Sequence, residues 1–137
     1  MLPVEHLIQA AQEARSRAYA PYSGYSVGAA LESDTGQISI GSNVENLSYG
    51  ATICAERSAI VGMVSNGLGS KVRQIAVSSL DGVTPCGICL QVLSEFVPKP
   101  NDLLVHSVAE DGRVQTYTFA ELLPHAFVSA EVRRTDS

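Results

Sequence analysis

Apolar residues recur at helical spacing near the start of the chain. They are Val4, Leu7, Ile8, Ala11, Ala14 and Ala18. A repeat of three and four residues places such side chains on one face of an α-helix. Pro21 closes the stretch, because proline lacks the backbone N–H that a continuing helix needs. The pattern predicts an amphipathic first helix with one buried face.

Two stretches of strand character come next. Residues 25–32 and 37–44 flank a short segment that contains the turn formers Asp34 and Gly36. This arrangement predicts a β-hairpin. An apolar run at 72–77 then indicates a buried strand.

A second hairpin is expected near the end of the chain. Residues 103–109 and 113–119 have strand character, and Asp111 and Gly112 lie between them. Two strands joined by an Asp-Gly turn commonly pair with each other.

Two further helices are predicted between these strands. One begins near residues 52–54, continues through Met63 and ends at Asn66-Gly67, a suitable left-handed stop. The other begins at Pro85 and ends before Pro98. Alternation of helices and strands predicts an α/β fold: a three-layer α/β/α sandwich with a mixed sheet of about five strands and helices on both faces.

The 137 residues suit one domain with one sizeable core. We expect this single domain to span residues 1–132, followed by a polar tail at 133–137. Apolar residues make up 45% of the sequence and charged residues 17%, a balance typical of folded globular proteins.

The charge balance bears on partners. Nine Lys and Arg against fourteen Asp and Glu give a formal net charge of -5, so no broad positive field is available to hold long nucleic acid. The first residues do not resemble a signal peptide, and no stretch approaches the length of a membrane span. We therefore expect a cytoplasmic protein with neither a nucleic-acid nor a membrane partner.

The three cysteines carry the main chemical signal. Cys86 and Cys89 form a C-x-x-C motif at a predicted helix start, where both sulfurs can point to one side of the first turn. Cys54 lies at the start of another predicted helix. Unpaired N–H groups and the positive dipole end at helix N-termini favour thiolates. Three ligands leave one position of a tetrahedral zinc ion open, as in catalytic zinc sites.

Two neighbours of Cys54 are candidates for chemistry. Three thiolates outweigh the charge of zinc by one, and Arg57 is placed to offset that charge by donating to cysteine sulfurs. Glu56 could move protons to and from water beside the metal, as in zinc nucleoside deaminases. A spacing of two does not share a helix face, so Glu56 reaches the metal only if Cys54 lies at the fraying helix start.

At these residues the chain resembles the small cytidine deaminases, the homotetrameric class that uses three cysteines. The matching segments fall in family order along nearly the whole chain: residues 20–23, 27–30, 41–46, 54–57, 85–89 and 121–124. A concordance of this length is far more specific than one C-x-x-C motif.

The resemblance implies an activity: zinc-dependent hydrolytic deamination of cytidine or deoxycytidine to uridine or deoxyuridine and ammonia. In the family, a hydroxide held by zinc attacks C4 of the base while a glutamate, here Glu56, shuttles protons. Zn²⁺ is the implied cofactor and a nucleoside the implied substrate. The family also implies a homotetramer whose pockets are completed by neighbouring subunits.

The resemblance also assigns substrate-binding residues. Asn43 and Glu45 would bind the ribose hydroxyls, since residues two apart in a strand face the same way. Tyr25 would lie against the nucleoside, and Ala55 would meet the pyrimidine edge through its backbone. Phe127 would be lent to the pocket of an adjoining subunit. Tyr49 is a further residue that could reach across an interface.

Two positions depart from the family pattern. Leu90 stands where the family usually has arginine, and His125 stands where glycine is common. The first removes a positive group near the metal, and the second adds bulk near a shared pocket. An enzyme acting on a modified cytidine or a nucleoside antibiotic is therefore the main alternative.

Other readings of these residues stay open. The cysteines could be small buried apolar residues, and Glu56 an ordinary glutamate of a first helical turn. Asn43 and Glu45 could be the solvent face of an edge strand, and the aromatic residues simple packing. A noncatalytic zinc module would need a fourth ligand, and no histidine stands in a motif position. A deaminase of polynucleotide bases would need a basic groove.

Overall fold

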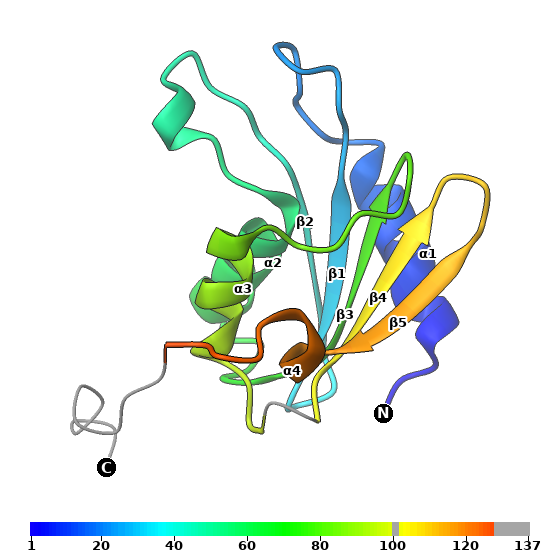
Figure 1. The fold of residues 1–137 in the computed structure, drawn as a ribbon, viewed down its shortest axis with the longest axis vertical. Coiled ribbons are helices and arrows are strands. Elements are labelled where there is room, and N and C mark those ends of the chain that lie inside the picture. Colours follow the sequence, from blue (N-terminus) through cyan, green and yellow to red (C-terminus); the bar gives the residue numbers. More distant parts are fainter. Residues whose placement is uncertain (100–101, 128–137) are drawn as a thin grey trace.

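The structure, a computed structural model, describes residues 1–99 and 102–127. It contains a five-stranded sheet in the order β2-β1-β3-β4-β5 (Figure 1). The strands are β1 (Gly28–Ser33), β2 (Ile38–Ser42), β3 (Val72–Ser79), β4 (Leu104–Ala109) and β5 (Val114–Thr118). The polar tail expected at 133–137 lies outside the described residues.

The sheet is mixed, as expected. β1 runs antiparallel to β2 and β3, β4 runs parallel to β3, and β5 runs antiparallel to β4. Helix α1 (Val4–Arg15) covers one face, while α2 (Ala55–Ser65) and α3 (Gly87–Ser94) cover the other (Figure 1). The three-layer α/β/α fold is confirmed. Among the described residues, no helix is long and apolar enough to cross a membrane.

Two apolar clusters hold the layers together. The larger joins the sheet to α2 and α3 and includes fully buried Leu31, Met63 and Ile75. The smaller joins α1 to the sheet around Leu7 and Ala30. Each buried large apolar side chain contributes about 1.5–3 kcal/mol, so the larger cluster fixes the two helices that carry the cysteines.

Two glycines let helices approach the sheet closely. A Cβ at Gly28 would lie 2.1 Å from the Ala11 carbonyl oxygen of α1. A Cβ at Gly41 would lie 2.5 Å from the Ala55 carbonyl oxygen and 2.4 Å from the Ala59 nitrogen of α2. The absence of a side chain at Gly41 therefore sets the position of the first turns of α2.

Several helices and strands are shorter than predicted. The first helix ends at Arg15, because the chain turns and Tyr19 pairs with the extended 43–45 segment through its N–H and carbonyl groups. The first hairpin is shorter than predicted at both outer ends, since residues 25–27 and 43–44 leave the sheet. The 16–27 and 43–52 segments extend beyond one end of the sheet (Figure 1).

The second and third helices start close to where they were predicted. Helix α2 ends at Ser65 with Asn66 as its C-cap, and Gly67 adopts a positive φ of 66°, the expected left-handed stop. Helix α3 ends at Ser94, before the predicted limit at Pro98, because the chain tightens into a turn in which the Phe96 N–H donates to the Leu93 carbonyl.

Two short helices were not predicted. One is a 3-10 turn, η1 (Tyr49–Ala51), and the other is α4 (Phe119–Leu122). Helix α4 begins with a capping box, in which Thr118 accepts from the Glu121 N–H and Glu121 accepts from the Thr118 N–H. The sequence carried this signal as Thr-x-x-Glu, which is typical of a helix start.

Candidate active site

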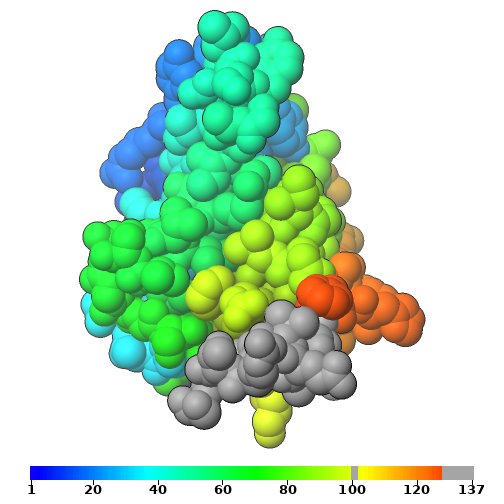
Figure 2. Space-filling view, turned by 90° about the vertical axis from the view of Figure 1, so that its left-hand side faces the viewer, coloured from blue at the N-terminus to red at the C-terminus, as the bar shows by residue number. Residues whose placement is uncertain are grey.

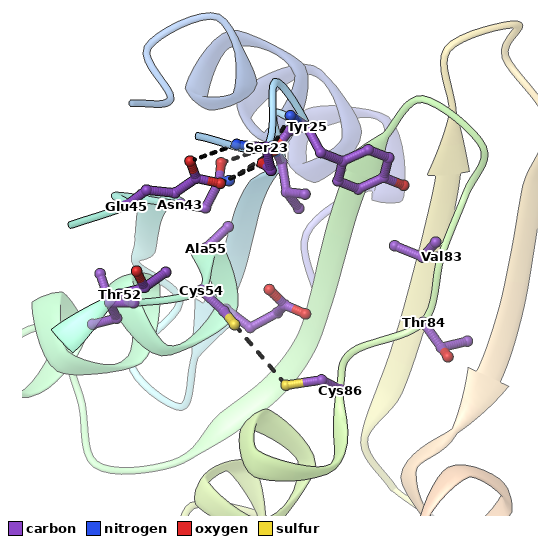
Figure 3. A pocket seen from close by; sticks show the side chains of 13 residues that line it. Ser23, Tyr25, Asn43, Glu45, Thr52, Cys54, Ala55, Val83, Thr84 and Cys86 are labelled. Carbon is purple, nitrogen blue, oxygen red and sulfur yellow. Dashed lines mark hydrogen bonds between the residues drawn. The ribbon is translucent and has the colours of Figure 1, made fainter. Parts of the chain in front are cut away.

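The structure brings the three cysteines together. Cys54 caps the N-terminus of α2, Cys86 caps that of α3, and Cys89 lies in the first turn of α3. Their sulfurs all lie within 4.8 Å of one another, and those of Cys54 and Cys86 are 3.9 Å apart (Figure 3). Zinc–sulfur bonds of about 2.3 Å in a tetrahedron separate two sulfurs by about 3.8 Å. The three cysteines fit a zinc ion.

The pKa values of the thiols indicate that a cation is needed to hold all three as thiolates. The pKa of Cys54 falls to about 5 because the Cys89 thiol donates to its sulfur, with a further donation from Arg57. The pKa of Cys89 is raised well above its usual value by that same contact with Cys54 and by burial. Three thiolates therefore need a compensating positive charge, which Zn²⁺ supplies.

Arg57 occupies the position expected of it. Its Nη2 lies 3.7 Å from the Cys54 sulfur and 3.3 Å from the Thr52 carbonyl oxygen, to both of which it donates. Arg57 lies in α2, so its guanidinium contacts the cysteine at the N-terminus of its own helix. Its Nε is buried and has no hydrogen-bond partner among the described residues.

Glu56 lies in the first turn of α2, two residues after the N-cap residue Cys54. Only 6% of its surface is exposed. Its pKa is raised to about 7, mainly by burial and also by the neighbouring Cys54 thiolate, against the opposing effects of its own backbone hydrogen bond and of Arg57. A carboxyl group with such a pKa can accept and release a proton near neutral pH.

A cavity of about 310 Å³ opens beside these residues (Figure 3). Its walls come from four segments of the chain, with lining residues Ser23, Tyr25, Val27, Asn43, Glu45, Thr52, Ile53, Cys54, Ala55, Glu56, Val83, Thr84 and Cys86. This volume is at the lower end of the range for small-ligand sites. Cys54, Cys86 and Glu56 thus face a space that suits a small molecule.

Asn43 and Glu45 both reach the 22–27 loop. The Asn43 amide donates to the Tyr25 carbonyl at 2.8 Å and accepts from the Val27 N–H at 2.9 Å. The Glu45 carboxylate accepts from two successive N–H groups of this loop at 2.9 and 3.1 Å, and from the Ser23 hydroxyl. The two side chains face the same way, and both support the loop that forms one cavity wall.

The remaining expected residues divide into two groups. Tyr25 and Ala55 line the cavity. Phe127 and Tyr49 do not: they are 69% and 74% exposed, and the backbone of Phe127 is held by the Gln91 side chain of α3. The chain's own cavity is therefore built without these two rings.

The two departures from the family pattern lie in different surroundings. Leu90 is buried in the larger apolar cluster, so its side chain contributes packing there. His125 is exposed. Six cavity residues were not predicted, because they lie between the helices and strands, in segments whose course depends on tertiary contacts: Ser23, Val27, Thr52, Ile53, Val83 and Thr84.

A buried carboxyl beside a three-cysteine zinc site and a small cavity, on this α/β/α fold, defines a zinc hydrolase. Residues 2–102 match the sequence model of the family described as the cytidine and deoxycytidylate deaminase zinc-binding region. The chain belongs to this family.

Individual relatives agree with this assignment. The chain is 42% identical to a cytidine deaminase of Sporosarcina psychrophila, covering 92% of both chains. A crystal structure of the cytidine deaminase from Burkholderia pseudomallei superposes with a TM-score of 0.84 and 41% identity, covering 92% of this chain and all of that one. A blasticidin-S deaminase of Bacillus cereus is more distant, at 33% identity, with 72% of this chain and 74% of that protein covered.

Proposed function

We propose that the protein hydrolyses cytidine and deoxycytidine to uridine and deoxyuridine, with release of ammonia. The observation that carries this proposal is the convergence of three sulfurs within 4.8 Å, where Cys54 and Cys86 line the same small cavity as the buried Glu56. Membership of the deaminase family supports the same reaction.

Cys54, Cys86 and Cys89 would hold the zinc, which when bound lowers the pKa of water toward neutrality. Glu56 supplies proton transfer. It takes one proton from the water that adds to C4 of the base and gives it to the ring nitrogen. It then takes the second proton of that water and gives it to the departing amino group. A pKa of about 7 suits both directions of transfer. The balance is one water consumed and one ammonia released.

Substrate binding is assigned to the cavity walls. Asn43 and Glu45 would contact the ribose hydroxyls, and the Tyr25 ring would lie against the base. Ala55 is the first residue of α2, so its N–H has no partner within the helix and could meet the pyrimidine edge. All four residues line the cavity.

We further propose a homotetramer in which Phe127 and Tyr49 contact neighbouring subunits. Large apolar side chains are exposed on α2, α3 and the 43–52 segment: Leu47, Tyr49, Val61, Val64 and Ile88. Figure 2 shows the face of the molecule that α2, α3 and the 43–52 segment form. Light scattering of the purified protein measures the assembly, and a monomer at working concentration would refute it.

An enzyme acting on a cytosine-containing nucleoside antibiotic is the second proposal. The similarity to the blasticidin-S deaminase favours it. Catalytic efficiency on cytidine, deoxycytidine and such an antibiotic, measured side by side, decides between the two. Three free cysteines in one metal site also support a cytoplasmic location, where thiols stay reduced. A role in pyrimidine salvage would follow from the proposed reaction on free nucleosides.

The decisive variant is Glu56→Gln. Zinc content per chain and ultraviolet absorbance with cytidine, deoxycytidine, cytosine, adenosine and a cytosine-containing oligonucleotide are measured for parent and variant. We expect turnover to be lost and zinc to be retained, because Glu56 moves protons and is not a ligand. Glu5→Gln, a matched change on the exposed side of α1, should leave both unchanged. A fully active Glu56→Gln enzyme would eliminate the proton-transfer role.

A further inference from the structure

A hydrogen bond joins two walls of the cavity. The phenol of Tyr25 donates to a carboxylate oxygen of Asp81, which is 56 residues away in the sequence. Tyr25 belongs to the 22–27 loop, and Asp81 belongs to the loop that runs from β3 to the ligand Cys86. Figure 3 shows the Tyr25 ring extending from its loop toward this second loop.

Both ends of this contact are anchored by other hydrogen bonds. The Tyr25 carbonyl accepts from Asn43, and its N–H donates to the Ser23 hydroxyl at 3.0 Å. The backbone of Asp81 forms a bridge to Ala109 at the end of β4. The Ser79 hydroxyl, at the base of the same loop, accepts from two N–H groups that follow Asp81, each at 3.0 Å. With both loop backbones held, the freedom that remains is rotation of the Tyr25 side chain.

We propose that Asp81 is a positioning residue, which fixes the Tyr25 ring as the cavity wall that receives the substrate's base. This inference rests on the proposed function, in which Tyr25 contacts the nucleoside. Asp81 does not itself line the cavity, so it acts through the phenol.

The chemistry of the phenol agrees with this role. Burial raises the pKa of Tyr25, and the bond to Asp81 raises it further. The hydroxyl therefore stays protonated and engaged with the carboxylate at neutral pH. Because its one proton is committed to Asp81, the ring meets the substrate through its carbon surface. That surface suits a flat pyrimidine base, through stacking or edge contact.

The test separates substrate binding from chemistry. Steady-state kinetics with cytidine are compared for parent, Asp81→Ala, Asp81→Asn, Tyr25→Phe and the double variant Tyr25→Phe/Asp81→Ala. We expect KM to rise about three- to tenfold in Asp81→Ala and in Tyr25→Phe, the range for loss of one hydrogen bond. kcat should change by less than about twofold, because Glu56 and the cysteines are untouched.

Three comparisons exclude a general structural effect. The double variant should match the single ones, because both remove the same contact. Asp81→Asn keeps an acceptor oxygen and should recover part of the lost affinity. Asp102→Ala, an equivalent loss of charge at an exposed position before β4, should leave KM unchanged. Multiplicative effects in the double variant, or an unchanged KM in Asp81→Ala, would overturn the inference.

A second measurement does not depend on turnover. Ultraviolet titration of tyrosine ionisation should show one phenol titrating at lower pH in Asp81→Ala than in the parent. Calorimetry with cytidine in the Glu56→Gln background gives the Kd directly. A parent enzyme without turnover, combined with a Kd that depends on Asp81, would refute the proposed function alone. Normal turnover with a Kd and a phenol titration indifferent to Asp81 would refute this inference alone, and absence of binding would refute both.

Discussion

Arg57 and Cys54 are joined by a hydrogen bond of 3.7 Å from the guanidinium Nη2 to the sulfur. The same nitrogen donates to the Thr52 carbonyl, so the guanidinium links the metal ligand to the backbone just before α2. Three thiolates carry one negative charge more than zinc neutralises. Arg57 places a positive charge beside one of these three sulfurs.

Replacing Arg57 with alanine should therefore weaken zinc binding. Loss of a hydrogen-bonded partner of a metal ligand commonly costs about 10- to 100-fold in metal affinity or activity. Zinc retained against a graded series of chelator concentrations measures the affinity. Arg113→Ala, which removes an exposed arginine paired with Asp111, is the matched control and should behave as the parent. Equal retention in all three proteins would discard the role of Arg57.

A methyl group at Gly41 should disturb the metal site from a distance. Its Cβ would lie 2.5 Å or less from backbone atoms of α2, so Gly41→Ala must push the helix that follows Cys54. Overpacking of this kind costs about 1–3 kcal/mol of unfolding free energy. Urea denaturation and zinc content should both report the change. Gly50→Ala meets no atom within 4 Å and should have little effect on either.

The pH dependence of the unfolding free energy should reflect protonation of His106. Its ring nitrogens lie 2.9 Å from Gln74 and 2.9 Å from Thr116, and burial lowers its pKa below the usual 6.5. The unfolded chain then binds a proton below about pH 6.5 that the folded chain does not. Stability should fall as the pH drops from 6.5 to the folded pKa, by at most about 1.4 kcal/mol per pH unit.

Urea denaturation at a series of pH values tests this for parent and His106→Gln. The variant should lack the slope just below pH 6.5. Glu32→Gln offers a contrast. Burial raises the pKa of Glu32, but hydrogen bonds from Gln74, the Leu2 N–H and Arg73 bring it below 4.5, so its contribution is lost only at more acid pH. Parallel profiles for parent and His106→Gln would contradict the prediction.

The metal site was predictable because its signals are local. A C-x-x-C motif at a helix start fixes two sulfurs within one turn, and the capping position of Cys54 frees Glu56 to face the cavity. The fold class followed from the alternation of helical and strand patterns. The boundaries of the elements did not, because α1 ends at Arg15 and Tyr19 pairs with a segment more than twenty residues later.

The cavity walls were harder to predict. Asn43 and Glu45 were expected to face the same way within a strand, yet β2 ends at Ser42 and both side chains hold the 22–27 loop. Likewise, the contact between Tyr25 and Asp81 joins the loop before β1 to the loop after β3, 56 residues apart, and leaves no trace in either local sequence. Contacts between loops depend on the packed structure around them.

The cysteine cluster joins α2 to α3 across 32 residues of chain. A coordinated ion therefore closes the loop from Cys54 to Cys86 in the folded chain. Because such a site rarely exists in the unfolded chain, the free energy of binding the ion stabilises the folded state. Helix α1 lies on the opposite face and is not part of that loop. Stripping the metal should accordingly speed amide hydrogen exchange in α2 and α3 while leaving α1 as protected as before.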